Sequence, residues 1–396
     1  MPSILLVLGL TSLAIWAYLL TLRGGFWRSA ERLDAASAPA LGRPAPAWPA
    51  VTAVVPARNE AEVIGESLAA LLAQDYPGRF GVVLVDDHSE DGTASVARAA
   101  AAGAEAGRFQ LLQAAPLPAG WTGKLWALHQ GTQAADAQSA FFWFSDADIR
   151  QPPDALRRLV AKAEAERRDL VSLMVALTCE SFWERLLIPP FIYFFQKLYP
   201  FAWANDPRAR TAAAAGGCVL LRRAALERIG GLGAIRHALI DDCTLAAAVK
   251  RSAPADSHGV WVGLATEARS IRPYSGLGAI WEMVARSAYN QLRHQPLLLA
   301  GTLVGMVLTY LAPPLLLLAW PWHREDVPAV LGALAWLLMA LSLLPTLRLY
   351  RQPFWLAPLL PLAAALYSAM TVDSAWRHWR GRGGRWKGRV QDSHAE

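Results

Sequence analysis

Cysteine is scarce in this chain of 396 residues, and charge is sparse. The three cysteines, Cys179, Cys218 and Cys243, form no Cys-x-x-Cys pair, and their number is odd. Neither a structural zinc site nor a disulfide framework is supported, and we expect a reducing compartment. Only 18% of the residues are charged while 54% are hydrophobic, a balance too apolar for a purely soluble enzyme.

The residues that are plentiful point to a membrane. Seventeen Trp residues favour a membrane–water boundary. The net charge of +6 suits an anionic lipid surface or a phosphate-bearing substrate. We expect no nucleic-acid partner, because the basic residues gather near apolar segments and in the tail, with no DNA-reading pattern between them.

Residues 1–23 are predicted to form a transmembrane helix, because Ile4–Leu22 is nearly unbroken apolar sequence. Arg23, Arg28 and Arg32 follow the apolar run, whereas a signal peptide carries its charge in front. The positive-inside rule then places the following chain in the cytoplasm. We expect an integral, multi-pass protein of the cell inner membrane, with residues 24–50 as a linker that is Ala/Pro-rich from residue 34 on.

Residues 297–372 are predicted to form a C-terminal transmembrane region, followed by a basic tail, residues 373–396. The region holds three apolar stretches: Leu297–Trp320, Val327–Leu347 and Phe354–Val372. Three crossings would put the tail outside, although its arginines favour the inside. Prolines at 313–314, or at 358 and 361, offer places where one stretch turns back or lies in the interface, so the count stays open.

The middle of the chain reads as an α/β domain. Val51–Val55, Val82–Val85 and Phe141–Phe144 are predicted buried strands, and Glu60–Gln74 and Gly92–Ala102 are predicted helices. This alternation predicts a mostly parallel, Rossmann-like sheet. Ligands bind beyond the carboxyl ends of such strands, so the polar residues directly after each strand are the candidates.

Two strand ends carry candidate nucleotide-binding residues. Asp86 and Asp87 follow the second strand and can accept hydrogen bonds from a base or from ribose hydroxyls. The next residues also suit a turn and a helix cap, and both interpretations stay open. After the first strand, the run VVPARNE either begins a nucleotide pocket or is an ordinary strand–turn–helix junction.

The third strand ends in Asp146-Ala147-Asp148. Short acidic side chains suit Mg²⁺ or Mn²⁺, which bind through few carboxylates plus substrate phosphates. An Asp-x-Asp pattern alone is common by chance, and its weight here comes from its position at a strand end. Lys124, after Gly123, can meet a phosphate.

Asp241-Asp242 begins a helix-like run. Two adjacent like charges raise the pKa of one of them if both face a cleft, and such a carboxylate can take a proton from a hydroxyl. A solvated helix cap is the competing interpretation. His129 is interpreted as a structural helix residue, and Gly216–Arg223 as a glycine turn entering a strand.

Taken together and in order, VVPARNE, VDDHSEDGT, GK, SDAD, GGC and DD resemble the family 2 glycosyltransferases. These are inverting enzymes with the GT-A nucleotide-diphospho-sugar fold. The similarity runs over residues 51–294, which we expect to form one cytoplasmic domain. The phrase GWTGKLWAL and the flanking spans resemble most the hopanoid-associated branch.

The resemblance implies roles for individual residues. Pro56, Asn59 and Glu60 would form the nucleotide pocket, with Asp86 and Asp87 on the base and ribose. Asp146 and Asp148 would be the Asp-x-Asp pair, Asp148 being the favoured metal ligand and Asp146 its support. Asp242 would be the catalytic base, although Asp241 replaces the family's Glu. Arg293 and Lys124 would pair with the diphosphate; Asn290 and His294 depart from the motif around Arg293, which disfavours processive polymer synthesis.

Residues 180–205 are rich in aromatic side chains, and we expect an interfacial amphipathic segment that leads a lipid to the site, with a buried subdomain as the alternative. The predicted function is transfer of a sugar from a nucleotide-diphospho-sugar to a lipid-type acceptor, in hopanoid biosynthesis by the finer resemblance. A catalytically idle scaffold is one alternative. A membrane transport component is another, but the Asp pairs lie away from every apolar stretch.

Overall fold

The computed structural model describes residues 3–33, 48–381, 385–386 and 389–390. The chain divides into two compact units. Unit 1 consists of residues 1–30, 179–202 and 274–385, and unit 2 of residues 31–178, 203–273 and 386–396. The expected linker lies largely in 34–47, and much of the expected basic tail lies beyond 381, outside the described residues. These bounds differ from the expected segments, because 179–202 and 274–294 group with the apolar helices.

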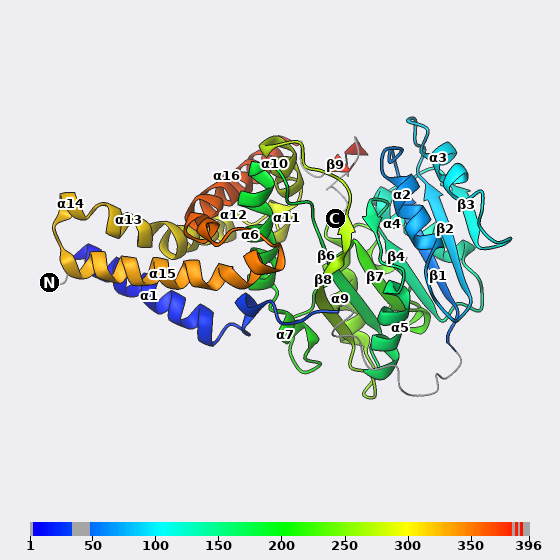
Figure 1. The fold of residues 1–396 in the computed structure, drawn as a ribbon, viewed down its shortest axis with the longest axis horizontal. Coiled ribbons are helices and arrows are strands. Elements are labelled where there is room, and N and C mark those ends of the chain that lie inside the picture. Colours follow the sequence, from blue (N-terminus) through cyan, green and yellow to red (C-terminus); the bar gives the residue numbers. More distant parts are fainter. Residues whose placement is uncertain (1–2, 34–47, 382–384, 387–388, 391–396) are drawn as a thin grey trace. The chain divides into compact units, whose positions relative to one another are not determined.

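Unit 2 is built on one eight-stranded sheet with the strand order β3-β2-β1-β4-β7-β6-β8-β5. The strands, most of them drawn to the right in Figure 1, have these bounds: β1 (Val51–Ala57), β2 (Phe80–Asp86), β3 (Phe109–Gln113), β4 (Phe141–Ser145), β5 (Ile149–Arg150), β6 (Leu170–Ala176), β7 (Cys218–Arg222) and β8 (Val260–Ser270). A separate short pair joins β9 (Arg385–Trp386) to β10 (Arg389–Val390).

The sheet confirms the predicted α/β class and shows where it is mixed. β1 pairs in parallel with β2 and β4, and β2 with β3, as the strand–helix alternation predicts. β7 is antiparallel to both β4 and β6, and β5 is antiparallel to β8. The second half of the sheet therefore departs from a simple parallel arrangement.

Helices cover both faces of this sheet, which explains why its central strands are buried along their whole length. Alternate residues of β1 belong to two different cores: Ala53 and Val55 to one, Val54 to the other. The first core includes side chains of α2 (Ile64–Leu72), α3 (Thr93–Ala100) and α5 (Ala155–Ala165). The second includes those of α4 (Gly123–Ala134), α8 (Arg223–Arg228), η2 (Leu232–Ile235) and α9 (Asp241–Ser252).

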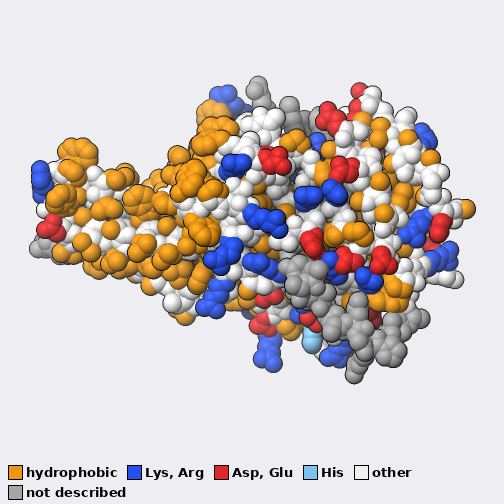
Figure 2. Space-filling view, viewed as in Figure 1, with side chains coloured by type: hydrophobic (Ala, Val, Ile, Leu, Met, Phe, Trp, Pro, Cys, Tyr) orange, Lys and Arg blue, Asp and Glu red, His pale blue; other side chains and the backbone are white. Residues whose placement is uncertain are grey.

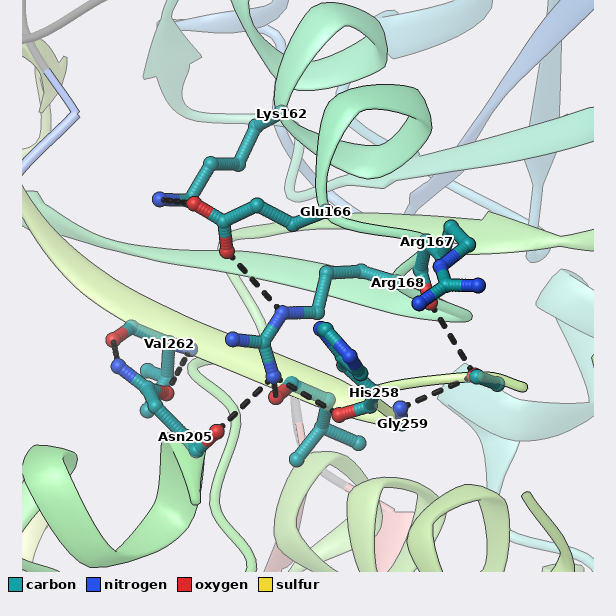
Figure 3. Close-up of polar contacts among 10 residues, drawn as sticks. Lys162, Glu166, Arg167, Arg168, Asn205, His258, Gly259 and Val262 are labelled. Atoms are coloured by element: carbon teal, nitrogen blue, oxygen red, sulfur yellow. Dashed lines mark hydrogen bonds and ion pairs between the residues drawn. The ribbon is translucent and has the colours of Figure 1, made fainter. Parts of the chain in front are cut away.

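Arg168 ties together the starts of two strands (Figure 3). Its Nη1 donates to the carbonyls of Asn205, His258 and Val260 at 2.9, 2.8 and 2.9 Å. The Asn205 side chain in turn exchanges two hydrogen bonds with the backbone of Val262. A buried cation is costly without acceptors, and these carbonyls supply them. The cluster therefore has a structural role at the starts of β6 and β8, whereas a ligand would bind at the carboxyl ends of the strands.

Unit 1 consists of helices with long apolar surfaces. The structure describes α1 (Ile4–Thr21), η1 (Phe26–Arg28), α6 (Phe182–Leu198), α10 (Leu277–Ala285), α11 (Ala288–Gln291), α12 (Pro296–Met306), η3 (Val307–Leu311), α13 (Ala312–Leu318), α14 (Trp320–His323), α15 (Asp326–Leu349), η4 (Phe354–Leu359) and α16 (Leu360–Trp379). A short helix, α7 (Phe201–Asn205), begins at the end of the second unit 1 segment and continues into unit 2.

Four stretches of unit 1 are long and apolar enough to cross a membrane: Ile4–Thr21, Pro296–Leu318, Asp326–Leu349 and Phe354–Trp379. Figure 2 shows hydrophobic side chains covering α1, α13 and α15. Val327, Val330 and Leu334 on α15 are among the exposed ones. A contiguous apolar surface of this size is unfavourable in water, which agrees with the predicted membrane association.

The segment predicted to be interfacial, residues 180–205, forms α6 and α7. Much of α6 is buried within unit 1, including Pro189, Pro190 and Tyr193. The Tyr193 hydroxyl lies 2.7 Å from Ser342 Oγ of α15, and Leu187 O accepts a hydrogen bond from Tyr367 of α16. α6 therefore serves mainly as a packing element, the alternative that the sequence left open; contact of its remaining face with a bilayer stays a prediction.

The Gly131→Ala variant tests the close packing of α4 on the sheet. A Cβ at Gly131 would lie 2.2 Å from a methyl carbon of Val54 and 3.1 Å from one of Val85. Alanine favours a helix over glycine by about 1 kcal/mol, but overpacking a core costs about 1–3 kcal/mol. Because Val54 is stiff and buried, we expect a lower unfolding temperature in detergent.

The matched control is Gly278→Ala in α10, where an added Cβ meets no atom within 4 Å. This control should unfold at the same or a higher temperature. An unchanged Gly131→Ala protein would contradict the tight α4–sheet contact.

Candidate functional site

Polar side chains gather where strands of unit 2 end. Asp86 closes β2, and Asp146 follows β4 directly. The antiparallel orientation of β7 pairs Cys218 with Ser145, which brings the turn before β7 to the same edge of the sheet. α4 and α9 present their first turns there, with Lys124 on one and Asp241 and Asp242 on the other.

The loops after β1 and β2 hold each other by hydrogen bonds. Asn59, at φ 52°, donates its N–H to Ser89 Oγ and accepts from Glu90 N through its side chain. Glu60 N donates to Thr93 Oγ1. Pro56 lies within β1, beyond the last residue of that strand that pairs with β4, where its missing N–H leaves that pairing intact.

Asp86 and Asp87 are both buried at this edge. Asp86 Oδ1 accepts a hydrogen bond from Ser89 N at 3.2 Å, so this carboxylate shapes the loop. Asp87 lies 3.7 Å from Arg58 Nη1, which also donates to the Asp87 carbonyl. Their predicted contact with a base and ribose stays a prediction.

Lys124 connects two of the acidic groups. Its Nζ lies 2.7 Å from Asp146 Oδ1 and 3.8 Å from Asp241 Oδ2. Burial opposes the charge of this ammonium, but the two carboxylates outweigh that effect and raise the pKa of Lys124. Lys124 is thus a fixed cation at the site throughout the physiological pH range.

Asp242 is held by two backbone N–H groups. Gly216 N donates to its Oδ2 at 2.9 Å and Cys243 N to its Oδ1 at 2.7 Å. Burial and the like charge of Asp241 raise the pKa of Asp242 to about 6, although Lys124 and the two N–H groups oppose the rise. A Cβ at position 216 would lie 3.1 Å from Lys124 Nζ, so glycine permits this close approach. Asp242 is therefore a positioned carboxylate that can take up a proton near neutral pH.

Asp148 contacts Arg272, whereas Asp146 contacts Lys124. Its Oδ2 accepts a hydrogen bond from Ser270 Oγ at 3.0 Å and lies 3.4 Å from Arg272 Nε. Burial and Asp146 raise the pKa of Asp148, against the effect of Arg272 and Ser270. Arg272 also forms an ion pair with Glu60, so it bridges the ends of β1, β4 and β8.

The donor set suits a hard divalent cation that also binds phosphate. Within the described residues, no three His, Cys, Asp or Glu side chains converge as a closed metal cage. Asp146 lies close enough to raise the pKa of the Asp148 carboxyl, and the side chains of Asp146 and Asp148 are 35% and 20% exposed. Mg²⁺ and Mn²⁺ bind through one or two carboxylates and fill the remaining positions with water and phosphate oxygens, so these residues fit.

Unit 2 brings together all the predicted site residues except Arg293. That residue follows α11 in unit 1, with a left-handed backbone at φ 52°, and its predicted contact with a diphosphate stays a prediction. Arg272, which the sequence analysis missed, is an arginine of unit 2 that contacts Glu60 and Asp148 at this edge. The available signal was its place just after the apolar run that forms β8. His129 lies in α4 against Trp126, as predicted for a structural residue.

The Lys124→Met variant tests the electrostatic role of this cation. Without it, the pKa of Asp242 should rise further, so the folded state binds protons that the unfolded state does not bind. Stability then increases as pH falls, and the loss in unfolding temperature relative to the wild type should narrow from about pH 8 to about pH 5.

Lys162→Met is the control, because Lys162 pairs with Glu166 and lies over the Trp261 ring, and it contacts none of the carboxylates of the site. Its loss in unfolding temperature should change less between about pH 8 and about pH 5 than that of Lys124→Met. An equal deficit for Lys124→Met at both pH values would contradict the proposed balance of charges.

Comparison with known proteins identifies the domain. Residues 52–230 match the family described as Glycosyl transferase family 2. No curated protein matches the chain. Among solved structures, it is similar to the mannosyltransferase PcManGT from Pyrobaculum calidifontis in complex with GDP-Man and Mn²⁺, with 21% identity and a TM-score of 0.52. That match covers 95% of this chain and 99% of the other.

A second similar structure is glucosyl-3-phosphoglycerate synthase from Mycobacterium tuberculosis in complex with Mg²⁺ and UDP. The identity is 18%, the TM-score is 0.39, and the match covers 61% of this chain and 79% of the other. The strand order and these comparisons agree: unit 2 has the α/β fold of the GT-A glycosyltransferases, and residues 52–230 are similar to glycosyl transferase family 2 domains.

Proposed function

We propose that the chain transfers a sugar, with inversion, from a nucleotide-diphospho-sugar to a hydroxyl group of a lipid. The observation that carries this proposal is the grouping of Asp242, Lys124 and the Asp146–Asp148 pair at one edge of the sheet. A base, a cation and a metal-binding pair are the three parts that displacement of a diphosphate needs.

Asp242 is the proposed catalytic base. It takes the proton of the acceptor hydroxyl as the hydroxyl oxygen bonds to the anomeric carbon, and the bond from that carbon to the diphosphate oxygen breaks on the opposite face. Its pKa of about 6 suits a base that is charged at neutral pH yet can hold a proton. The two backbone N–H donors fix both carboxylate oxygens, which orients the group.

The donor is proposed to lie across the ends of β1, β2 and β4. Pro56, Asn59 and Glu60, with Asp86 and Asp87, would border the nucleotide, as the resemblance implies. Lys124 and Arg272 are the cations that contact Asp146 and Asp148, and they would meet the diphosphate. Both are held by carboxylates, so they are positioned before the donor arrives.

Asp148, supported by Asp146, would hold Mg²⁺ or Mn²⁺. The bound ion would supply positive charge to the departing diphosphate. Arg272 and Lys124 restrain the two carboxylates from either side, which keeps the pair oriented without a third protein ligand.

The lipid acceptor is inferred from the membrane part. An enzyme acting on a water-soluble acceptor has no need of four apolar helices, whereas a polyprenyl, sterol-like or hopanoid alcohol resides in the bilayer. Membership of the hopanoid-associated branch, residence in the inner membrane and a cytoplasmic catalytic domain belong to this same proposal. The acidic residues of the candidate site lie in unit 2, outside all four apolar stretches, which disfavours a transport role.

The direct test is incubation of membranes containing the chain with labelled nucleotide sugars and Mg²⁺ or Mn²⁺, followed by lipid extraction and mass analysis. The donor panel should include GDP-mannose and UDP-glucose, since similar structures hold GDP-Man and UDP. We expect label in one lipid species, lost when the divalent metal is chelated. Donor binding without transfer or hydrolysis would favour the idle scaffold, and label only in soluble products would contradict a lipid acceptor.

The Asp242→Asn variant tests the base. We expect transfer to fall by about 10²–10⁴-fold while the donor still binds, because the amide cannot take the proton. In the wild type, transfer should decline as pH drops through about 6, when Asp242 becomes protonated. Initial rates across a pH series and donor titration by calorimetry measure the two effects.

Asp241→Asn is the matched control. It removes the like charge that raises the pKa of Asp242, so the acid limb of the pH profile should move to lower pH. Full transfer by Asp242→Asn would remove Asp242 from the base role. An acid limb that stays in place in Asp241→Asn would show that another group titrates.

A further inference from the structure

The helices of unit 1 have two recognisable ends. α1 and α15 lie side by side: Ser3 Oγ donates to Glu325 at one end, and Ser29 Oγ lies 3.3 Å from Thr346 Oγ1 at the other. We call these the far end and the near end. The near end of α1 continues through Arg23 into the chain that leads to unit 2.

Phe354–Trp379 starts at the near end. Gln352, just after α15, donates to the carbonyl of Cys179, the first residue of the second unit 1 segment. η4 then runs back along α15, where Trp336 Nε1 donates to Pro358 O at 3.1 Å. η4 has six residues, which at about 2 Å each cover about 12 Å, well short of the ~30 Å hydrocarbon core.

α16 then returns to the near end. Trp281 of α10 donates to Asp373, and Tyr289 N of α11 donates to Ser374 Oγ. α10 and α11 precede α12, whose Leu299 packs with Tyr289 and Ala375 in one cluster. After α12 the chain passes Trp16, whose Nε1 donates to the carbonyl of Thr309, and then reaches Glu325 at the far end. The start of α12 therefore lies toward the near end, and so do α10 and α11, which precede it. Figure 1 shows α16 beside α10 and α12, while α13 and α14 extend away.

The apolar part of α16 is too short to cross. Its last turns carry Asp373, Arg377 and His378, and Arg377 pairs with Asp373 and with Glu282 of α10. The run from Leu360 to Val372 is 13 residues, about 20 Å of helix against the ~30 Å core.

We infer that Phe354–Trp379 enters the bilayer and returns to the side from which it came. The chain then crosses the membrane three times, through α1, α12–α13 and α15, and Arg380 lies on the same side as Arg23. Irregular backbone at membrane depth must be buried in protein, and in the short 3₁₀ helix η4, Leu356 and Ala357 are 5% and 2% exposed, whereas Phe354 and Trp355 at its start are exposed. The hydrogen bond from Trp336 satisfies the Pro358 carbonyl at the turning point.

The distribution of charge supports this topology independently. The segments at the near end carry the basic residues Arg23, Arg28, Arg348, Arg351, Arg377 and Arg380. The far end carries Arg324 together with Glu325 and Asp326. A re-entrant last segment satisfies the positive-inside rule at every turn, whereas a fourth crossing would place Arg377 and Arg380 on the side of Glu325.

Single cysteines labelled with a membrane-impermeant maleimide, in sealed vesicles of known orientation, test the topology. The background is Cys179→Ser, because the other two cysteines are buried. Ala30→Cys reports the near side, Trp322→Cys the far side, and Arg380→Cys is the test; Trp322 is 82% exposed. We expect Arg380→Cys to react from the side of Ala30→Cys and Trp322→Cys from the opposite side.

Reaction of Arg380→Cys from the side of Trp322→Cys, or from both sides while the references stay one-sided, would overturn the re-entrant topology. An epitope added at the C-terminus of the otherwise unaltered full chain gives a second measurement that needs no cysteine variant. Antibody access to it from the near side supports re-entry, and access from the far side overturns it. Nothing in this topology depends on the proposed reaction, so the sugar-transfer assay can fail without affecting it.

Discussion

Carboxylates that lie at one edge of a sheet repel one another, and the site in unit 2 depends on the cation placed between them. Two unit charges 4 Å apart interact by about 4 kcal/mol near a protein surface, a large fraction of a domain's stability. Lys124 contacts Asp146 at 2.7 Å and Asp241 at 3.8 Å, so it offsets much of this repulsion. Asp242 accepts hydrogen bonds from two backbone N–H groups. Burial and the repulsion by Asp241 that is not offset raise its pKa to about 6. The same balance stabilises the fold and prepares a base.

This arrangement depends on one antiparallel strand. Because β7 runs opposite to β4, the residue before β7 lies at the edge where β4 ends, with Cys218 opposite Ser145. Gly216 N can then donate to Asp242, while Lys124 Nζ lies 3.1 Å from where a Cβ of residue 216 would be. A parallel β7 would carry Gly216 to the opposite edge, and the carboxylate would lose one of the two donors that orient it. The antiparallel direction of β7 is therefore required for the geometry of the site.

The sequence predicted the parts of this site that follow from local pattern. Asp86 and Asp146 come directly after buried apolar runs, and strand ends at one edge must meet, so both were identified. Arg272 also follows an apolar run, that of β8, but its partners Glu60 and Asp148 are set by the pairing of β8 with β5 and β6, which local pattern does not reveal. The direction of β7 was hidden for the same reason. In α6, aromatic and charged residues suit both an interface and a core, and only contacts such as that of Tyr193 with Ser342 distinguish them.

Segments of unit 1 and unit 2 alternate along the chain, and Glu184 connects two of the unit 1 segments. It is buried, yet its carboxylate accepts N–H groups from Glu180, Ser181 and Tyr274, which hold its pKa below the ordinary value despite burial. Tyr274 opens the last segment of unit 1, so one carboxylate joins two segments separated by residues 203–273 of unit 2. Two further polar partners of α6, Ser342 and Tyr367, lie later still in the chain. Because such long-range contacts form only after the intervening chain has closed, α6 cannot complete these contacts until the C-terminal helices are in place, so unit 1 completes its folding late.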